Sequence, residues 1–209
     1  GVALGAHEVQ IYTDVDGVMT ADPRTCDAAG VLERIGADEL FQMARAGSRV
    51  VHTPAAELAV HRGVAMRVRN TYSDHPGTRV TVGVADAPDR VATAVSSGPK
   101  VARVTVALPS PEGTAQHMRA QTRVFAGMAD AGISLDMFTP LADRLVFTVP
   151  HDAVEQTGHV LQGLALPFEV TPDLAKVTVI GAGMHGVPGV MARVASSLES
   201  AGVTVLQSA

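Results

Sequence analysis

The second half of the chain contains an internal repeat, which restricts the possible fold more than any other feature of the sequence. Residues 102–106, Ala-Arg-Val-Thr-Val, return as residues 175–179, Ala-Lys-Val-Thr-Val. Residues 130–135, Asp-Ala-Gly-Ile-Ser-Leu, return as Ser-Ala-Gly-Val-Thr-Val near the end of the chain. Both pairs are about 70 residues apart, so the sequence predicts a duplicated unit of that length. Each copy has the pattern of a strand, a glycine-containing loop, an amphipathic helix that ends at Ala-Gly, and a second strand.

The first copy continues beyond the pattern that both copies share. Its periodicity predicts a strand over 144–149, a helix over 152–161 and a strand over 167–170. Strand, helix, strand, strand, helix, strand is the order of a ferredoxin-like fold. The second copy stops after its second strand, so we expect an incomplete unit whose open edge is covered by a partner chain or by residues outside this sequence. Its helix carries apolar residues on one face, which predicts burial of that face on a sheet, at Met191, Val194, Ala195 and Leu198.

The first half of the chain alternates between strand and helix patterns, as α/β domains do. The predicted elements are a strand over 9–12, helices over 38–46 and 54–60, and a strand over 64–68. The first strand ends in a turn that contains Asp14, Asp16 and Gly17. Hydroxyls, amides and carboxylates at the ends of such strands converge on the crevice where ligands lie. We therefore predict ligand binding there, with a polar loop closed by an Asx turn as the alternative.

Composition limits the class of partner. The 209 residues are 46% hydrophobic and 18% charged, which is typical of a globular protein. A net charge of -5 disfavours nucleic acid and membrane as partners, because both favour a concentrated basic surface. The single cysteine, Cys26, cannot form an internal disulfide, and no stretch approaches the roughly 20 apolar residues of a membrane span. We expect a cytoplasmic protein that binds small metabolites.

A linker is predicted between the two halves. Residues 81–100 lack a sustained helical period and are rich in Ala, Pro, Ser, Gly and Asp. The predicted domains are therefore 1–80, then 101–172 as the first ferredoxin-like unit and 173–209 as the incomplete second one.

Residues 13–24, Thr-Asp-Val-Asp-Gly-Val-Met-Thr-Ala-Asp-Pro-Arg, resemble the nucleotide-holding segment of aspartate kinases, in the amino-acid kinase superfamily. The visible change is Met19, where the family usually has Tyr. Residues 47–55 resemble a second family segment, with Arg49 in place of a nucleotide-contacting lysine. The resemblance implies ATP and Mg²⁺ as cofactors, with Arg24 as a phosphate partner. The cofactor-binding residues that it implies are Thr13, Asp14, Met19, Thr20, Ala21, Asp22, Pro23, Arg24, Arg49 and Val50.

The repeated units resemble tandem ACT domains, which are small amino-acid-sensing modules that dimerise edge to edge. The implied fold is the remnant of a three-layer α/β amino-acid kinase domain followed by two ferredoxin-like ACT units, the second incomplete. The chain departs from the family in its 108–113 loop, which lacks Asp-x-Pro-Gly, and at Pro140, where a Gln would grip the effector. A ligand-free turn remains the alternative for the glycine-rich loop over 181–190. The implied effector-binding residues are Ser110, Glu112, Gly113, Ser134, Leu135, Asp136, Val190, Met191, Thr204 and Val205.

Two functions follow from the resemblance. The first is an aspartate kinase, which transfers the γ-phosphoryl group of ATP to the side-chain carboxylate of L-aspartate, giving 4-phospho-L-aspartate for lysine, threonine and methionine biosynthesis. The family's Lys-Phe-Gly-Gly strand and Gly-Gly-Ser-Asp loop are missing from this sequence, so we expect no activity from the chain alone and assign no catalytic residue or metal ligand. The second is a non-catalytic subunit for amino-acid sensing or dimerisation. The expected partners are L-aspartate, lysine or threonine as a possible effector, and a second copy of the chain bound through the ACT domains.

Overall fold

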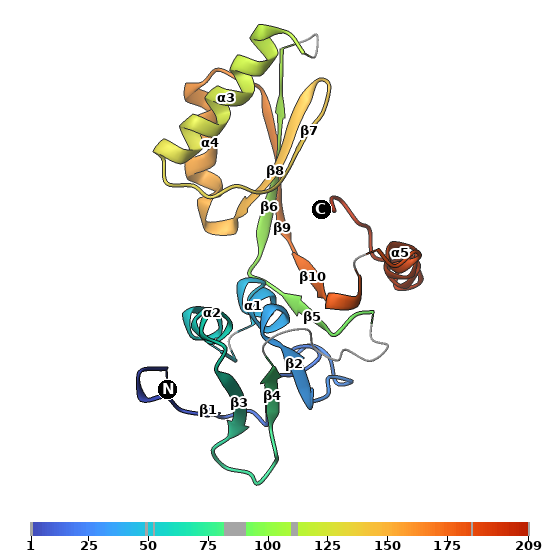
Figure 1. Cartoon of the computed structure of the whole chain (residues 1–209). Coiled ribbons are helices and arrows are strands. Elements are labelled where there is room, and N and C mark those ends of the chain that lie inside the picture. The colour runs from blue at the N-terminus through green and yellow to red at the C-terminus, as the bar shows by residue number, and fades with distance from the viewer. Residues whose placement is uncertain are drawn as a thin grey trace. The chain divides into compact units, whose positions relative to one another are not determined.

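The computed structural model of the chain describes residues 2–48, 50–51, 53–81, 91–109, 113–184 and 186–208. The chain forms two compact units, whose elements are labelled in Figure 1. Unit 1 contains Gly1–Gly98 and Val177–Val203, and unit 2 contains Pro99–Lys176 and Thr204–Ala209. The larger segment of unit 2, Pro99–Lys176, is therefore inserted into unit 1 along the sequence, and its shorter segment follows unit 1.

Unit 1 contains a four-stranded sheet in the order β1-β3-β4-β2. Its strands are β1 (Glu8–Thr13), β2 (Arg34–Gly36), β3 (Ala65–Asn70) and β4 (Thr78–Thr81). β1 and β3 are parallel and align Thr13 with Asn70, so both strands end at the same edge of the sheet. β2 and β4 are also parallel, whereas β3 and β4 are antiparallel. The strands expected over 9–12 and 64–68 are confirmed, but β2 and β4 are too short, at 3 and 4 residues, to show a periodic pattern.

Two helices of unit 1 pack against each other, α1 (Ala37–Arg45) and α2 (Thr53–Arg62). Asp38 and Glu39 lie in the first turn of α1, where a negative charge interacts favourably with the helix dipole. Leu40 and Met43 of α1 are buried in the same core as residues of the sheet. Both predicted helices are confirmed to within two residues at each end. A short 3-10 helix, η1, covers Val2–Leu4.

A two-stranded antiparallel ribbon completes the strands of unit 1, made of β5 (Ala94–Ser97) and β10 (Val177–Ile180). β5 lies inside the segment expected to be a linker, where no strand was predicted. Ala94 and Ser96 are buried, whereas Val95 and Ser97 are exposed, which is the alternation of a half-buried strand. The strand was not predicted because its partner strand, β10, lies far along the sequence, after residues 99–176 of unit 2.

The helix α5 (Val190–Ser200) follows β10 and the short η3 (Ala182–Met184). Its apolar face was expected to be buried on a sheet, and this expectation is wrong for the described chain. None of the residues of α5 is buried, and Met191 is 64% exposed. Val194 and Leu198 are only half-buried. The spacing of apolar residues predicted the helix correctly but did not predict what covers it.

Unit 2 is a four-stranded antiparallel sheet in the order β7-β8-β6-β9, with both of its long helices on one face (Figure 1). Val104 and Phe147 of the sheet are buried together with Val124, Met128 and Leu161 of the helices. The ferredoxin-like order expected from the first copy is confirmed. Its elements are β6 (Val101–Ala107), α3 (Ala115–Asp130), β7 (Asp136–Pro140), β8 (Arg144–Pro150), η2 (His151–Ala153), α4 (Val154–Gly163) and β9 (Phe168–Leu174).

The final described segment, 203–208, was expected to be the second strand of the second copy. It has no regular secondary structure. Side chains hold it within unit 2, because Arg103 Nη1 donates to the carbonyl of Leu206 (3.2 Å) and Gln207 Nε2 donates to the carbonyl of Met137 and to Thr139 Oγ1. The strand pattern is present in the sequence, but the segment makes no ladder with a neighbouring strand among the described residues.

Candidate nucleotide-binding site

The candidate site begins where the parallel strands β1 and β3 end. The carbonyl of Thr13 accepts hydrogen bonds from the backbone N–H of Thr71 (2.8 Å) and from its hydroxyl (3.0 Å). The exposed Asp14 follows, and its Oδ1 accepts a hydrogen bond from Thr13 Oγ1 (3.1 Å). The carboxyl ends of adjacent parallel strands are where ligands usually bind in α/β sheets, so Thr13 and Asp14 lie at a suitable edge.

Asp16 connects this edge to the segment after β3. Its Oδ1 accepts hydrogen bonds from Ser73 Oγ (2.6 Å) and Asn70 Nδ2 (2.8 Å). These two bonds, first that of Ser73 and then that of Asn70, lower the pKa of Asp16 below its ordinary value. From the sequence, no role was assigned to Asn70 or Ser73 and this contact was not predicted. The available signal was the polar composition of the stretch around them directly after a strand.

Residues 18–32 form a hairpin that carries the rest of the candidate residues. The backbone of Leu32 donates to the carbonyl of Val18 (2.8 Å), and Met19 forms an antiparallel bridge with Val31. Thr20 bonds Gly30 twice, since its N–H donates to the Gly30 carbonyl (2.9 Å) and its Oγ1 accepts from the Gly30 N–H (3.0 Å). The sequence between them, including Ala21 and Pro23, is therefore the loop of this hairpin.

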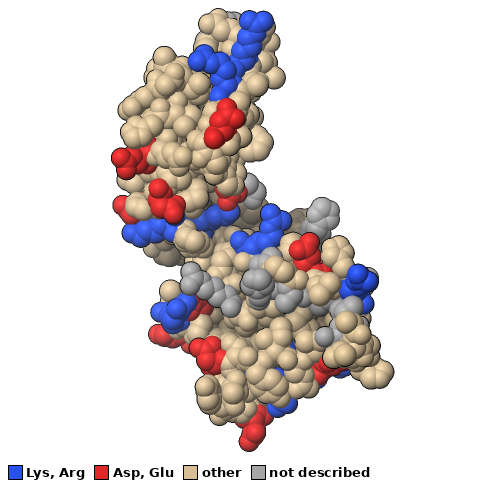
Figure 2. Space-filling view, turned by 90° about the vertical axis from the view of Figure 1, so that its left-hand side faces the viewer, with Lys and Arg blue, Asp and Glu red and all other residues tan. Residues whose placement is uncertain are grey.

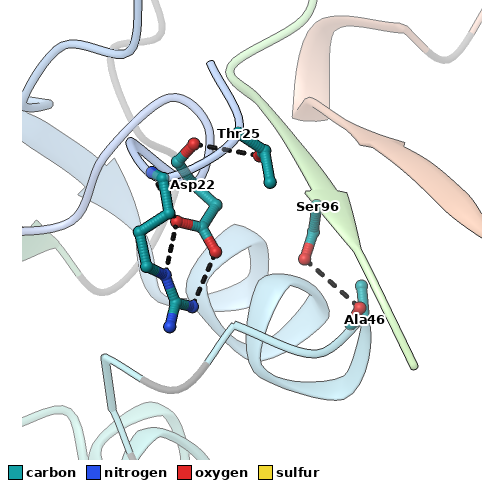
Figure 3. Close-up of polar contacts among 5 residues, drawn as sticks. Asp22, Thr25, Ala46 and Ser96 are labelled. Atoms are coloured by element: carbon teal, nitrogen blue, oxygen red, sulfur yellow. Dashed lines mark hydrogen bonds and ion pairs between the residues drawn. The ribbon is translucent and has the colours of Figure 1, made fainter. Parts of the chain in front are cut away.

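Asp22 and Arg24 form an ion pair within this loop (Figure 3). Arg24 Nε donates to Asp22 Oδ1 (3.0 Å) and Arg24 Nη2 donates to Oδ2 (2.7 Å). These bonds lower the pKa of Asp22 to about 2. The Arg24 side chain is 84% exposed, and two of the five N–H groups of its guanidinium are used. The remaining three can donate to an anionic group such as a phosphate.

The hairpin is also bonded to the ribbon. The backbone N–H of Val95 in β5 donates to the carbonyl of Thr20 (2.8 Å), and the N–H of Thr93 donates to the carbonyl of Ile180 in β10 (2.7 Å). Ser96 Oγ bonds the carbonyl of Ala46 after α1 (3.2 Å; Figure 3). The segment that resembles a nucleotide site is thus hydrogen-bonded directly to β5. β5 in turn pairs with β10, which lies at the start of the second repeat.

Two further cofactor-binding candidates follow α1. Val50 is half-buried and packs on the core of unit 1. Arg49 lies outside the described residues. The structure therefore brings together Thr13 to Arg24 as one folded segment, and Val50 contributes to the core beside it.

The effector candidates are distributed over both units. In unit 2, Asp136 begins β7, and its carboxylate accepts from the N–H of Met137 (2.9 Å) and pairs with Lys176 Nζ. Val190 and Met191 begin α5 in unit 1. Ser110 and Glu112 lie outside the described residues. The remaining candidates belong to unit 2, where Leu135 is half-buried and the other four are exposed: Gly113, Ser134, Leu135, Thr204 and Val205.

The charged side chains do not gather by sign on the face shown in Figure 2, where acidic and basic residues are interspersed. Within the described ranges, no three His, Cys, Asp or Glu side chains come together as a metal-binding group would require. None of the helices in the same ranges has both the length and the apolar character needed to cross a membrane.

Comparison with known families and sequences gives one consistent assignment. The amino acid kinase family matches residues 1–70, and the ACT domain matches residues 169–209. Aspartokinase 1 of Bacillus subtilis is 37% identical over 215 residues, which covers 100% of this chain and 52% of that protein. An aspartokinase of Thermus thermophilus is 34% identical, covering 97% of this chain and 51% of that protein. The chain spans about half the length of the curated relatives that it matches.

Solved structures agree with this assignment. An aspartate kinase of Clostridium acetobutylicum covers 97% of this chain with a TM-score of 0.88, and at 17% identity it shows a shared fold; the chain covers 48% of it. E. coli aspartokinase III in complex with aspartate and ADP covers 95% of this chain with a TM-score of 0.78 and 26% identity; the chain covers 45% of it. An amino acid kinase match is thus followed along the chain by an ACT match, and relatives that align over nearly all of it are aspartokinases. The chain is therefore similar to aspartokinases over nearly its whole length.

Proposed function

We propose that the chain provides part of the ATP site and the regulatory region of an aspartate kinase. The reaction transfers the γ-phosphoryl group of ATP to the side-chain carboxylate of L-aspartate. The observation that carries the proposal is the folded Thr13–Arg24 segment, which starts at the carboxyl end of β1 and presents Arg24 with three free N–H donors. An aligned E. coli relative was solved with aspartate and ADP bound, which supports the same ligands here.

The nucleotide roles follow from the chemistry of each side chain. Thr13 and Asp14 would contact the ribose and base, and Met19 would pack on the base as a polarisable apolar group. Arg24 would meet phosphate oxygens with the N–H groups that Asp22 leaves free. Bound Mg²⁺ would neutralise phosphate charge. Mg²⁺ is commonly held by one or two carboxylates together with phosphates, so the lack of a three-residue ligand group among the described residues is compatible with that mode.

The chain's contribution to the chemistry is to orient the nucleotide. The carboxylate of aspartate is ionised at neutral pH and can attack phosphorus without a general base. Phosphoryl transfer depends mainly on positioning and on neutralising charge. We therefore assign no proton-transfer role to any residue of this chain.

The regulatory part of the proposal concerns both repeats. Residues 101–172 would form one ACT domain and 173–209 part of a second, with the boundary to the kinase part near residue 80. A relative solved with lysine and aspartate bound, E. coli aspartokinase III, has a TM-score of 0.73 over 95% of this chain at 26% identity, and it supports an amino-acid effector. Lysine or threonine is the proposed effector. A homodimer through the ACT domains would bring its binding residues together.

A chimera tests the proposed activity. The amino-terminal half of the B. subtilis relative, joined to this chain at the aligned position, is assayed for ADP release with ATP, Mg²⁺ and L-aspartate. We expect release that depends on L-aspartate, and an Arg24→Gln chimera to lose at least about tenfold in kcat/KM, because a charge-assisted phosphate contact is removed. A folded chimera that releases no ADP in response to L-aspartate would contradict the proposal.

Calorimetry separates this function from the alternative. A purely regulatory subunit would bind lysine or threonine but not MgADP. The proposed kinase part binds MgADP, whether or not an effector binds.

A further inference from the structure

Thr78 lies at the base of the 18–32 hairpin, outside the segment that sequence reasoning assigned to the nucleotide. It is the first residue of β4 and is completely buried. Its Oγ1 accepts a hydrogen bond from the backbone N–H of Val18 (2.8 Å) and donates one to the carbonyl of Leu32 (2.6 Å). One hydroxyl therefore bonds both legs of the hairpin.

Gly17 makes this contact possible. A Cβ added at Gly17 would lie 2.5 Å from Thr78 Oγ1 and 3.1 Å from the backbone nitrogen of Thr78. It would also lie 2.9 Å from Cγ1 of Val31 in the opposite leg. Only a residue without a side chain leaves room for the hydroxyl at this position, so Gly17 and Thr78 act as one fitted pair.

The bonds of Thr78 are made to backbone groups of buried residues in the hairpin. Val18 and Leu32 are both buried, so their backbone groups cannot exchange the Thr78 hydroxyl for water without opening the hairpin. The Val18 carbonyl is meanwhile occupied by the N–H of Leu32 (2.8 Å). The next residues along the first leg, Met19 and Thr20, are candidate nucleotide contacts.

We propose that Thr78 is a positioning residue for the nucleotide segment, a role that rests on the proposed function of that segment. Its hydroxyl fixes the separation of the hairpin legs at Val18 and Leu32, and thereby the placement of Met19 to Arg24. Thr78 does not touch the nucleotide itself. The strand β4 that carries it is anchored on both sides, by β2 and by β3.

Three variants of the chain test this proposal. Thr78→Val keeps the shape of the side chain and removes the hydroxyl, whereas Thr78→Ser keeps the hydroxyl and removes the methyl group. Thr148→Val is the matched control, because Thr148 is 4% exposed and its hydroxyl donates to the carbonyl of Asp136 (2.8 Å) in unit 2.

The first readout is amide hydrogen exchange without nucleotide. In Thr78→Val we expect the amides of Val18, Thr20 and Leu32 to exchange at least about tenfold faster, while amides of β1 and β3 keep their protection. Thr78→Ser should restore protection to within about threefold, and Thr148→Val should leave these amides unchanged. Unchanged exchange at Val18 and Leu32 in Thr78→Val, or an equal loss over the whole of unit 1, would overturn the proposal.

The second readout is the Kd for MgADP. We expect Thr78→Val to bind about tenfold more weakly, with Thr78→Ser and Thr148→Val close to the parent chain. A looser hairpin with an unchanged Kd would overturn the positioning role while leaving the nucleotide site intact. If the parent chain binds no MgADP, the proposed function of the segment fails, and the role of Thr78 toward the nucleotide fails with it.

Discussion

Arg24 has two partners in the proposed site, the carboxylate of Asp22 and a phosphate of the nucleotide. Asp22 orients the guanidinium through two parallel hydrogen bonds, which reduces the freedom that an exposed arginine would otherwise have. The lowered pKa of Asp22 means that the pair stabilises the folded loop above the ordinary pKa of an aspartate. This contribution is lost as the pH falls through about 2.

Replacing the arginine should therefore change how Asp22 titrates. In Arg24→Gln, we expect the pKa of Asp22 to rise from about 2 toward 3.8, because its strongest hydrogen bonds and the nearby positive charge are gone. Carboxyl carbon shifts followed by NMR from pH 7 to pH 2 measure this directly. Asp16 is the internal control, since Ser73 and Asn70 hold its pKa down independently of Arg24. An unchanged Asp22 titration would show that the pair does not form in solution.

The sequence singled out the candidate residues between Thr13 and Arg24 because they are consecutive and closely follow a family pattern, and their role in binding a nucleotide stays a prediction. It did not identify Asn70 or Thr78. The partner of Asn70 is 54 residues away and that of Thr78 is 60 residues away, and no local pattern encodes such a contact. The role of Gly17 likewise follows from the space around it and could not be distinguished from ordinary turn chemistry in the sequence.

Helix α1 shows how one element joins the kinase-like part to the ribbon of β5 and β10. Glu39 is 4% exposed, and its Oε2 accepts from the N–H of Gly36 (3.1 Å) at the helix start. Its Oε1 accepts from Thr93 Oγ1 (2.7 Å) and from the N–H of Ala182 (2.9 Å). A buried carboxylate with three donors is well satisfied, so Glu39 fixes α1 to the segments before β5 and after β10.

Removing that charge should destabilise unit 1. Glu39→Gln puts an amide N–H₂ among three groups that donate, so we expect a loss of about 1–3 kcal/mol in the free energy of unfolding. Urea unfolding, with amide exchange of unit 1 as a second probe, measures the loss. Glu33→Gln, at an exposed position of unit 1, is the control and should change stability by less than about 0.5 kcal/mol. Equal effects of the two variants would contradict the bonding role of Glu39.

The elements themselves were predictable to different degrees. Helices α1 and α2 were predicted because their apolar spacing and their start and stop residues agree, and the ferredoxin-like order of unit 2 followed from six strong patterns in succession. The strand β5 was not predicted, because it has only four residues and its partner strand β10 lies about 80 residues later in the sequence. The apolar face of α5 was expected to be buried, but none of the residues of this helix is buried. Apolar spacing predicts a helix with an apolar face and does not identify the element that covers it.

At the scale of the whole molecule, the proposed nucleotide part and the proposed regulatory part belong to one chain. The order of these parts was predicted from sequence, and the amino acid kinase and ACT matches confirm it. The domain boundaries near residues 80, 100 and 172 stay predictions. Unit 2 exposes the large apolar side chains of Met118 (55%) and Phe138 (58%), which favours association with another chain.

The proposed homodimer can be tested by sedimentation. We expect the chain to sediment as a dimer at micromolar concentration, and Phe138→Asp to shift it toward monomer, because a charge would be buried in an apolar contact. Leu4→Asp is the control, since Leu4 is 87% exposed in unit 1 and lies outside the ACT units. A monomer at all concentrations, or a Phe138→Asp dimer as stable as the parent, would argue against association through unit 2.

We propose that the segment from Thr13 to Arg24 holds a purine nucleotide, and NMR shifts of the backbone amides during a MgADP titration measure this binding. We expect the amides of this segment to shift most and those of unit 2 to shift little. Arg24→Gln should weaken the response at least about tenfold, whereas Arg119→Gln, exposed on α3, should not. Shifts concentrated in unit 2, or no shifts at millimolar MgADP, would contradict this proposal.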